Sequence, residues 1–192
     1  MATAGPNSPG TLANDNSFGT AAWSNPGNAA SSNNSYASVV LTSTNSSQYL
    51  KATNFSFSIP GGSTIDGILV DIERSADSGV TIRDTRVRLV KGGAVGSTDK
   101  AATGTSWPGA DATASYGSSS DLWGDTWTDS DINASNFGVV VACTTPSGGS
   151  GINAFVDHIR ITITYTAGGG GQPMALRQSQ IRTGFATVGR GF

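Results

Sequence analysis

The sequence has few of the residue types that most enzymes use for catalysis. Among its 192 residues it has one cysteine (Cys143), one histidine (His158) and one glutamate (Glu73). We expect His158 and Glu73 to lie on polar strand faces, solvated or paired across strands, and Cys143 to be a small buried hydrophobe. Gly-x-Ser-x-Gly, phosphate-loop, dinucleotide-binding and zinc motifs are absent. The sequence therefore predicts a protein that is not an enzyme, has no catalytic residues and holds no cofactor.

Charge and long apolar runs are scarce as well. Charged residues make up 12% of the chain, roughly half of the usual share. No apolar run approaches the roughly 20 residues that span a bilayer, and residues 1–10 lack the basic and apolar regions of a secretory signal. A single cysteine excludes an intrachain disulfide. We expect no membrane partner and a fold stabilised by packing alone.

Small polar residues take the place of the missing charges. Glycine occurs 26 times, and serine and threonine together make up about a quarter of the chain. This composition is typical of short strands joined by polar turns. Apolar or alternating patterns cover residues 36–41, 49–57, 65–74, 80–90 and 155–165. With no helix long enough for a βαβ crossover, we expect an all-β fold: an antiparallel β-sandwich of jelly-roll type with extended N- and C-terminal arms.

The segment 155–165 has the clearest two-residue period. The pattern predicts one apolar face, formed by Phe155, Ile159, Ile161, Ile163 and Tyr165, and one polar face, formed by His158, Arg160, Thr162 and Thr164. Asp157 falls on the apolar face. We therefore expect it near the start of the strand, where it accepts hydrogen bonds from a turn.

One short helix is predicted between residues 117 and 137. Thr128 precedes Asp131 by three residues, which is a variant of the capping box, and we expect Gly138 to end the helix. Asp121, Asp125, Asp129 and Asp131 lie close together in this region. Calcium binding is one interpretation, although the spacing does not match an EF-hand loop. The favoured interpretation is that these aspartates cap the helix and form turns, and that they hold no metal.

Aromatic side chains gather around the same region. Trp107, Tyr116, Trp123 and Trp127 are candidate glycan contacts, because exposed indoles stack on sugar rings. The alternation places Trp123 and Trp127 on one side of the chain. We favour the interpretation that they close one end of the sandwich, since each indole buries a large area.

Three regions are expected along the chain. Residues 1–20 are rich in Pro, Gly and Asn and are expected to form an extended lead-in without a secondary-structure element. Residues 21–167 are the β-sandwich domain, and residues 168–192 are a glycine hinge followed by a basic arm. Residues 1–171 carry 8 basic and 13 acidic groups, a net charge of 8 − 13 = −5, whereas the arm carries three arginines and no acid. This distribution fits an arm of one copy bound to the body of another and argues against nucleic acid as a partner.

Several stretches resemble a β-sandwich domain of tailed-bacteriophage structural proteins, in head decoration and in fibres. They are residues 57–68 and 70–74, Leu122-Trp123-Gly124, Thr126-Trp127-Thr128, Asp131-Ile132-Asn133 and residues 156–161. The resemblance covers roughly residues 20–166 and implies a component of the virion.

From this resemblance and the basic arm, we expect a homo-oligomeric decoration or cement protein that contacts the major capsid protein or tail components. The residues expected to bind these partners are Leu176, Arg177, Ile181, Arg182, Phe185, Val188, Arg190 and Phe192. The alternative is a tail-fibre or receptor-binding module that recognises a host glycan.

Overall fold

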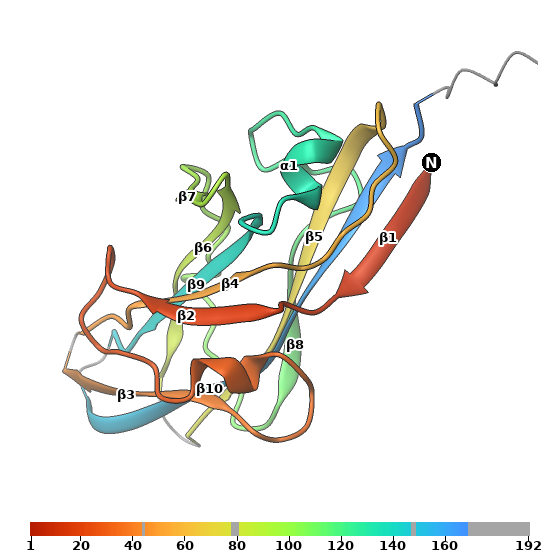
Figure 1. Cartoon of the computed structure of the whole chain (residues 1–192). Coiled ribbons are helices and arrows are strands. Elements are labelled where there is room, and N and C mark those ends of the chain that lie inside the picture. The colour runs from red at the N-terminus through yellow and green to blue at the C-terminus, as the bar shows by residue number, and fades with distance from the viewer. Residues whose placement is uncertain (44, 78–80, 147–148, 169–192) are drawn as a thin grey trace, which may run out of the picture.

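The protein is an all-β sandwich of two packed antiparallel sheets (Figure 1). The computed structural model describes residues 1–43, 45–77, 81–146 and 149–168. Within these residues, two short helical elements accompany the sheets: the 3-10 helix η1 (Pro26–Ala29) and the helix α1 (Asp129–Asn133). No helix in the described part of the chain is long and apolar enough to cross a membrane.

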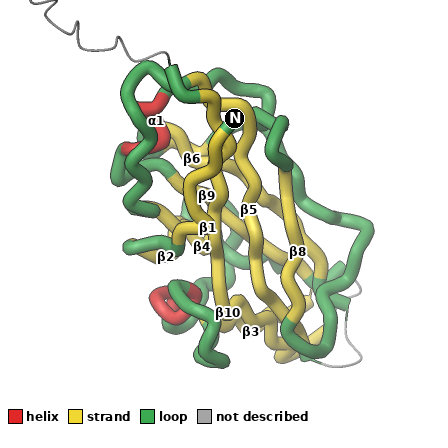
Figure 2. Tube along the Cα trace, turned by 90° about the vertical axis from the view of Figure 1, so that its right-hand side faces the viewer, coloured by secondary structure: helices red, strands yellow, loops and turns green. Residues whose placement is uncertain are grey.

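The first sheet is organised around one very long strand. Figure 2 shows it with its neighbours side by side. The strand β10 (Gly149–Thr166) pairs along one side with β5 (Thr64–Ala76), and on its other side first with β3 (Ala37–Ser43) and then with β1 (Ala2–Asn7). Beyond β5 lies β8 (Ala112–Gly117), which is the last strand at that edge.

The second sheet has its most apolar strand in the middle. Its strands follow the order β2 (Thr11–Asp15), β4 (Tyr49–Thr53), β9 (Gly138–Thr144), β6 (Arg83–Lys91) and β7 (Ala94–Val95). Every residue of β9 from Gly138 to Cys143 is buried. Val139 and Val141 face the main core, while Val140 faces an outer cluster that Phe18 helps to cover. Cover on both faces explains the unbroken apolar run.

The main core fills the space between the two sheets. It combines alternate residues of β5 and β10, such as Ile72 and Ile161, with residues of the second sheet, such as Leu50 and Val87. All four side chains are fully buried. The two-residue period identified from the sequence is therefore the main determinant of this packing.

The face assignment for residues 155–165 is right in its centre and wrong at its ends. Ile159, Ile161 and Ile163 are fully buried as predicted. A register shift between Val156 and His158 inserts one extra residue, so Phe155 lies on the opposite face. A second shift, between Thr164 and Tyr165, leaves Thr164 buried, contrary to its predicted polar-face position.

Asp157 is the extra residue at the first of these shifts. Its carboxylate accepts hydrogen bonds from the backbone N–H of Asn33 at 3.2 Å and of Asn34 at 3.2 Å. The expectation that Asp157 accepts from a turn is confirmed. Its expected place near the start of the strand is wrong, because β10 begins at Gly149.

The N-terminal segment, residues 1–20, contains two strands, β1 and β2. The expectation that this segment is an extended lead-in without a secondary-structure element is therefore wrong. Ala2 pairs with Tyr165, and Thr11 pairs with Thr53. Both strands lie at sheet edges, where side chains need no apolar period, and this explains why composition alone conceals them. Pro6 has no N–H to donate, and the pairing of β1 shifts between Ala4 and Asn7.

The C-terminal arm lies outside the described residues. Gly168 is the last residue described and lies against the Gly62 turn. All eight residues expected to bind partners, from Leu176 to Phe192, fall in the part of the chain that is not described.

The burial of β10 generates the first prediction. Ile161→Ala should lower the free energy of unfolding by about 2–5 kcal/mol, because it removes a fully buried side chain from the interface between the sheets. Thr162→Ala, one residue further on the opposite face, should cost less than about 1 kcal/mol. Urea unfolding followed by circular dichroism measures both. Equal losses would show that the two faces of β10 are wrongly assigned.

Candidate functional site

A cavity of about 250 Å³ opens beside the β6–β7 hairpin and is the candidate site. We call it the hairpin pocket. One wall comes from β6 and the residues after β7, and the other from the loop that precedes α1. The lining residues are Leu89, Lys91, Gly96, Ser97, Thr98, Trp123, Gly124, Asp125 and Trp127.

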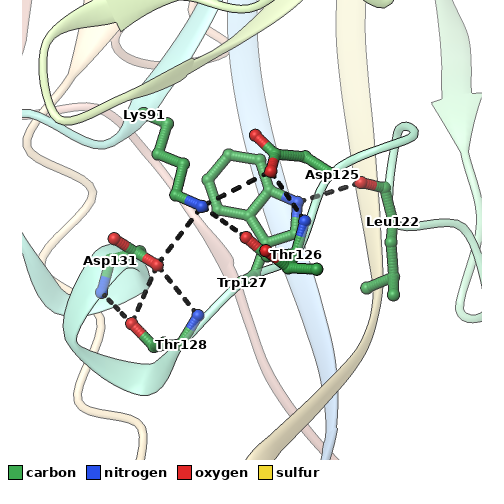
Figure 3. A network of polar contacts seen from close by, with 7 residues as sticks. All are labelled: Lys91, Leu122, Asp125, Thr126, Trp127, Thr128 and Asp131. Carbon is green, nitrogen blue, oxygen red and sulfur yellow. Dashed lines mark hydrogen bonds and ion pairs between the residues drawn. The ribbon is translucent and has the colours of Figure 1, made fainter.

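Lys91 is the most constrained polar residue of this pocket (Figure 3). Its Nζ lies 3.5 Å from Asp125 Oδ1 and 3.6 Å from Asp131 Oδ2, and it donates to the carbonyl oxygen of Thr126. It also lies 5.2 Å from the centroid of the Trp127 ring. Asp125 and Thr126 O thus accept hydrogen bonds from the ammonium and Asp131 adds an ionic contact, and together they hold the side chain in place.

The short helix α1 supplies one of these acceptors. Thr128 and Asp131 form the predicted capping box: Asp131 N donates to Thr128 Oγ1 at 3.1 Å, and Thr128 N donates to Asp131 Oδ2 at 3.0 Å. Burial raises the pKa of Asp131, but the hydrogen bonds from Thr128 and the charge of Lys91 outweigh this effect and lower it. The prediction that Gly138 ends the helix is wrong, because the helix ends at Asn133 and Gly138 begins β9.

A second lysine covers the other tryptophan. Lys100 Nζ lies 2.6 Å from Asp121 Oδ2 and 5.3 Å from the Trp123 ring centroid. Asp121 also accepts from the Trp123 backbone N–H at 2.8 Å. Asp121, Asp125 and Asp131 therefore hold lysines and backbone groups, and Asp129 lies in the first turn of α1. Across the described ranges, no three acidic, histidine or cysteine side chains come together to hold a metal ion.

The four candidate glycan contacts are all buried. Trp107 and Trp123 are 3% exposed, Tyr116 is 5% exposed and Trp127 is 9% exposed. Trp123 Nε1 donates to Ile68 O, and Trp127 Nε1 donates to Leu122 O, both at 2.9 Å. The structure places Trp123 and Trp127 in the wall of the hairpin pocket and the other two around a different group. None of the four presents an open ring face to solvent.

That other group is Asp84, which no pattern in the sequence indicated as important. Its carboxylate is fully buried and accepts from Arg74 Nη1, from Trp107 Nε1 at 2.8 Å and from Tyr116 Oη at 2.7 Å. The backbone N–H of Ala102 donates to it at 2.9 Å. Burial lowers the pKa of the Arg74 guanidinium and raises the pKa of Tyr116 to about 12. The two predicted glycan contacts Trp107 and Tyr116 thus serve as hydrogen-bond donors inside the core.

The three residues considered for catalysis occupy structural positions. His158 lies opposite Glu73 in the register of β10 and β5, and its Nε2 is 2.8 Å from Ser8 Oγ. Burial lowers the pKa of His158. Cys143 is fully buried, and burial raises the pKa of its thiol to about 12. Neither group combines the exposure and the activating partner that a nucleophile or a general base requires.

A second hollow, of about 240 Å³, lies at the far end of β5. Its lining residues are Tyr36, Ser75, Ala76, Asp77, Gly109 and Phe155. The rings of Tyr36 and Phe155 pack edge to face, with their centroids 5.4 Å apart. Tyr36 Oη donates to Asp111 at 2.7 Å, and this bond raises the pKa of Tyr36 to about 12. The described lining of this hollow includes a carboxylate and two aromatic rings but no basic side chain.

The Asp84 group generates the second prediction. Asp84→Ala should lower the free energy of unfolding by about 3–5 kcal/mol, because it leaves the Arg74 charge buried without a partner. Asp125→Ala, which removes an exposed aspartate paired with Lys91, should cost less than about 1 kcal/mol.

The loss of stability in Asp84→Ala has two contributions: the missing contacts of Asp84 and the unpaired charge of Arg74. The double variant Arg74→Met/Asp84→Leu separates them. It removes both charges together and should recover much of the stability lost in Asp84→Ala. Urea midpoints measure all three variants. An Asp84→Ala protein as stable as Asp125→Ala would contradict the importance assigned to the buried pair.

Cys143 generates the third prediction. A chromogenic aromatic disulfide should react with the native protein very slowly, because the thiol is fully buried and its pKa is about 12. One thiol per chain should react promptly in concentrated urea. Absorbance of the released thiolate measures both rates, and fast reaction of the native protein would show that Cys143 is accessible.

Comparison of the chain with protein-family models, curated proteins and solved structures finds no match. The likeness to phage structural domains therefore depends on the residues quoted above.

Proposed function

We propose that this protein is a non-enzymatic structural protein of a bacteriophage virion, a jelly-roll β-sandwich with an extended C-terminal arm. In this proposal it acts as a homo-oligomer and decorates or cements the particle through its C-terminal arm, residues 168–192. The arm of one copy binds the body of a neighbouring copy or another virion protein. The resemblance in sequence suggests the class of protein, and the distribution of charge on the body carries the mechanism.

The observation that carries the proposal is a surplus of carboxylates on the described body. Seven of its eight basic residues lie within 4.0 Å of a carboxylate; they are Lys51, Arg74, Arg86, Arg88, Lys91, Lys100 and Arg160. Six carboxylates have no ion pair with another described residue: Asp66, Glu73, Asp77, Asp111, Asp129 and Asp157. Asp157 is buried, but the other five are partly exposed, so the body has acidic groups available for a basic partner, and the arm has three arginines with no acid.

Three of these carboxylates lie near one end of the first sheet. Glu73 belongs to β5, Asp77 directly follows it, and Asp111 directly precedes β8. The hollow between Tyr36 and Phe155 lies at the same end. A guanidinium pairs with carboxylates in a planar, bidentate geometry and stacks on aromatic rings. This chemistry supports an arginine of the arm as the group that binds here.

The edge of the same sheet offers backbone groups to an extended chain. β8 is the last strand in the sheet order, and most of its side chains are small and exposed. An edge of this kind can accept a further strand through main-chain hydrogen bonds. Apolar anchors such as Leu176 and Phe185 would add burial worth about 25 cal/mol per Å² before the cost of ordering the arm. Repetition on a symmetric particle would then multiply a modest affinity.

The fourth prediction tests the arm in the full chain. Replacing Arg177, Arg182 and Arg190 together by Glu should shift the protein from oligomer towards monomer, because the arm would then carry the same sign of charge as the body. The matched control replaces the same three residues by Lys and should keep most of the self-association. Sedimentation velocity measures the oligomeric state, and circular dichroism checks that both variants are folded.

Particles provide the test of the virion role itself. The wild-type chain and the Lys variant should co-sediment with particles of the phage that encodes the chain, after the resident copy has been stripped, and the Glu variant should remain in the supernatant. Added salt should weaken wild-type binding only in part, since apolar anchors are not screened. Equal co-sedimentation of the Glu variant would overturn the arm mechanism, and absence of the wild-type chain from intact virions would overturn the virion role.

A further inference from the structure

We infer that the hairpin pocket is a binding site for a single neutral sugar ring, such as the end residue of a glycan. The inference rests on the geometry of the pocket and not on the proposed virion role. It also differs from the stacking on open indole faces that the sequence suggests, because Trp123 and Trp127 are buried in the wall of the pocket.

The size of the pocket limits the ligand to one ring. Its volume of about 250 Å³ is below the roughly 300–1,000 Å³ of sites that enclose drug-sized molecules. A longer saccharide would leave its other units outside, over the exposed residues Ser97 and Gly124. The pocket would therefore recognise one unit of a chain.

Unused polar atoms indicate the chemistry of that unit. Among the described residues, Asp125 Oδ1 accepts from Thr126 N at 2.7 Å and lies close to Lys91 Nζ, but no hydrogen bond uses Asp125 Oδ2. Ser97 Oγ and Thr98 Oγ1 also make no hydrogen bond there. One acceptor and two hydroxyls, each able to donate and accept, match the vicinal hydroxyl groups of a sugar.

The charge of the lining favours a neutral ligand over an anion. Lys91 and Asp125 are the only charged residues in the described lining of the pocket, and they pair with each other at 3.5 Å. The charge of Lys91 is already compensated by Asp125 and Asp131, and its ammonium donates to Thr126 O, so it offers little attraction to a phosphate or carboxylate. An anion would also lie against the free oxygen of Asp125. We therefore assign Lys91 as a positioning residue and Asp125 as a ligand contact.

The backbone of the pocket wall is unusually constrained. Trp123 and Gly124 both have left-handed backbone angles, with φ of 55° and 67°. This conformation is uncommon for a residue as bulky as tryptophan, and such strain is concentrated at binding sites. The hydrogen bond from Trp123 Nε1 to Ile68 O helps to offset its cost. At Gly124, a Cβ would lie 2.8 Å from Thr98 Oγ1, so glycine leaves this hydroxyl accessible.

Apolar groups complete the match to a sugar. Leu89, Trp123 and Trp127 form the apolar part of the lining. Sugar rings combine hydroxyl groups with apolar C–H groups, and the C–H groups can contact the small parts of these three side chains that reach the pocket. A purely polar ion would make no use of this part of the wall.

The fifth prediction concerns binding of free monosaccharides to the full-length protein. Saturation-transfer NMR with glucose, galactose, mannose and N-acetylglucosamine should detect at least one neutral sugar in the millimolar range. Asp125→Ala should lower the affinity for that sugar by about tenfold or more, because the substitution removes a charged hydrogen-bond acceptor. Ser97→Trp, at an exposed position, should abolish binding by filling the pocket.

The matched control is Asp129→Ala, which removes an aspartate in the same region that does not line the pocket. It should leave sugar binding unchanged, and thermal melts should confirm that all variants are folded. The Glu variant of the arm should also bind sugar normally, so failure of the arm mechanism and failure of this inference can be distinguished.

Three results would overturn the inference. They are the absence of signal from every neutral sugar, binding of only anionic probes such as sialic acid or inorganic phosphate, and equal affinity of wild type and Asp125→Ala.

Discussion

The buried contact between Arg74 and Asp84 connects the two sheets of this protein. Arg74 belongs to β5 in the first sheet and Asp84 to β6 in the second, and both side chains are excluded from water. A charge left unpaired at this position would cost several kcal/mol, which is a large part of the marginal stability of a domain. Tyr116 and Trp107 complete the shell around Asp84, so β8 and the segment that precedes it are also held in place. This one carboxylate therefore joins both sheets and the segment before β8 in a single buried polar contact group.

The surface uses charge in a different way from the core. Lys91 and Lys100 each lie over a tryptophan ring and are held by aspartates, in pairs that remain partly exposed to water. Such pairs contribute little to stability. Their main effect is to fix the position of the loop before α1, and this loop forms one wall of the hairpin pocket. Stability and site geometry are thus supplied by different sets of ionic contacts.

Sequence reasoning was sufficient for the regular parts of the fold and insufficient for the irregular ones. Alternation identified the segments of β3, β4, β5, β6 and β10, and the Thr128–Asp131 spacing identified α1. The edge strands β1, β2, β7 and β8 were missed because they are short and their residues show no apolar period. Phe155 was assigned to the wrong face because a β-bulge changes the parity within a strand. The hairpin pocket could not be predicted, since Lys91 and Asp125 are brought together only where the end of β6 packs against a loop 34 residues further along the chain.

The residues on which the proposed likeness to a phage domain depends mostly perform structural tasks in this protein. Ile59 exchanges two backbone hydrogen bonds with the side chain of Asn133, Trp123 donates into the core and Asp157 binds a turn. Residues with such tasks recur wherever a fold recurs, so the resemblance carries information about architecture more than about role. Asp125 falls between the resembling stretches, and Ser97 and Thr98 lie outside them, as does the arm. If function differs among domains built on this plan, these are the positions at which this chain would acquire its own.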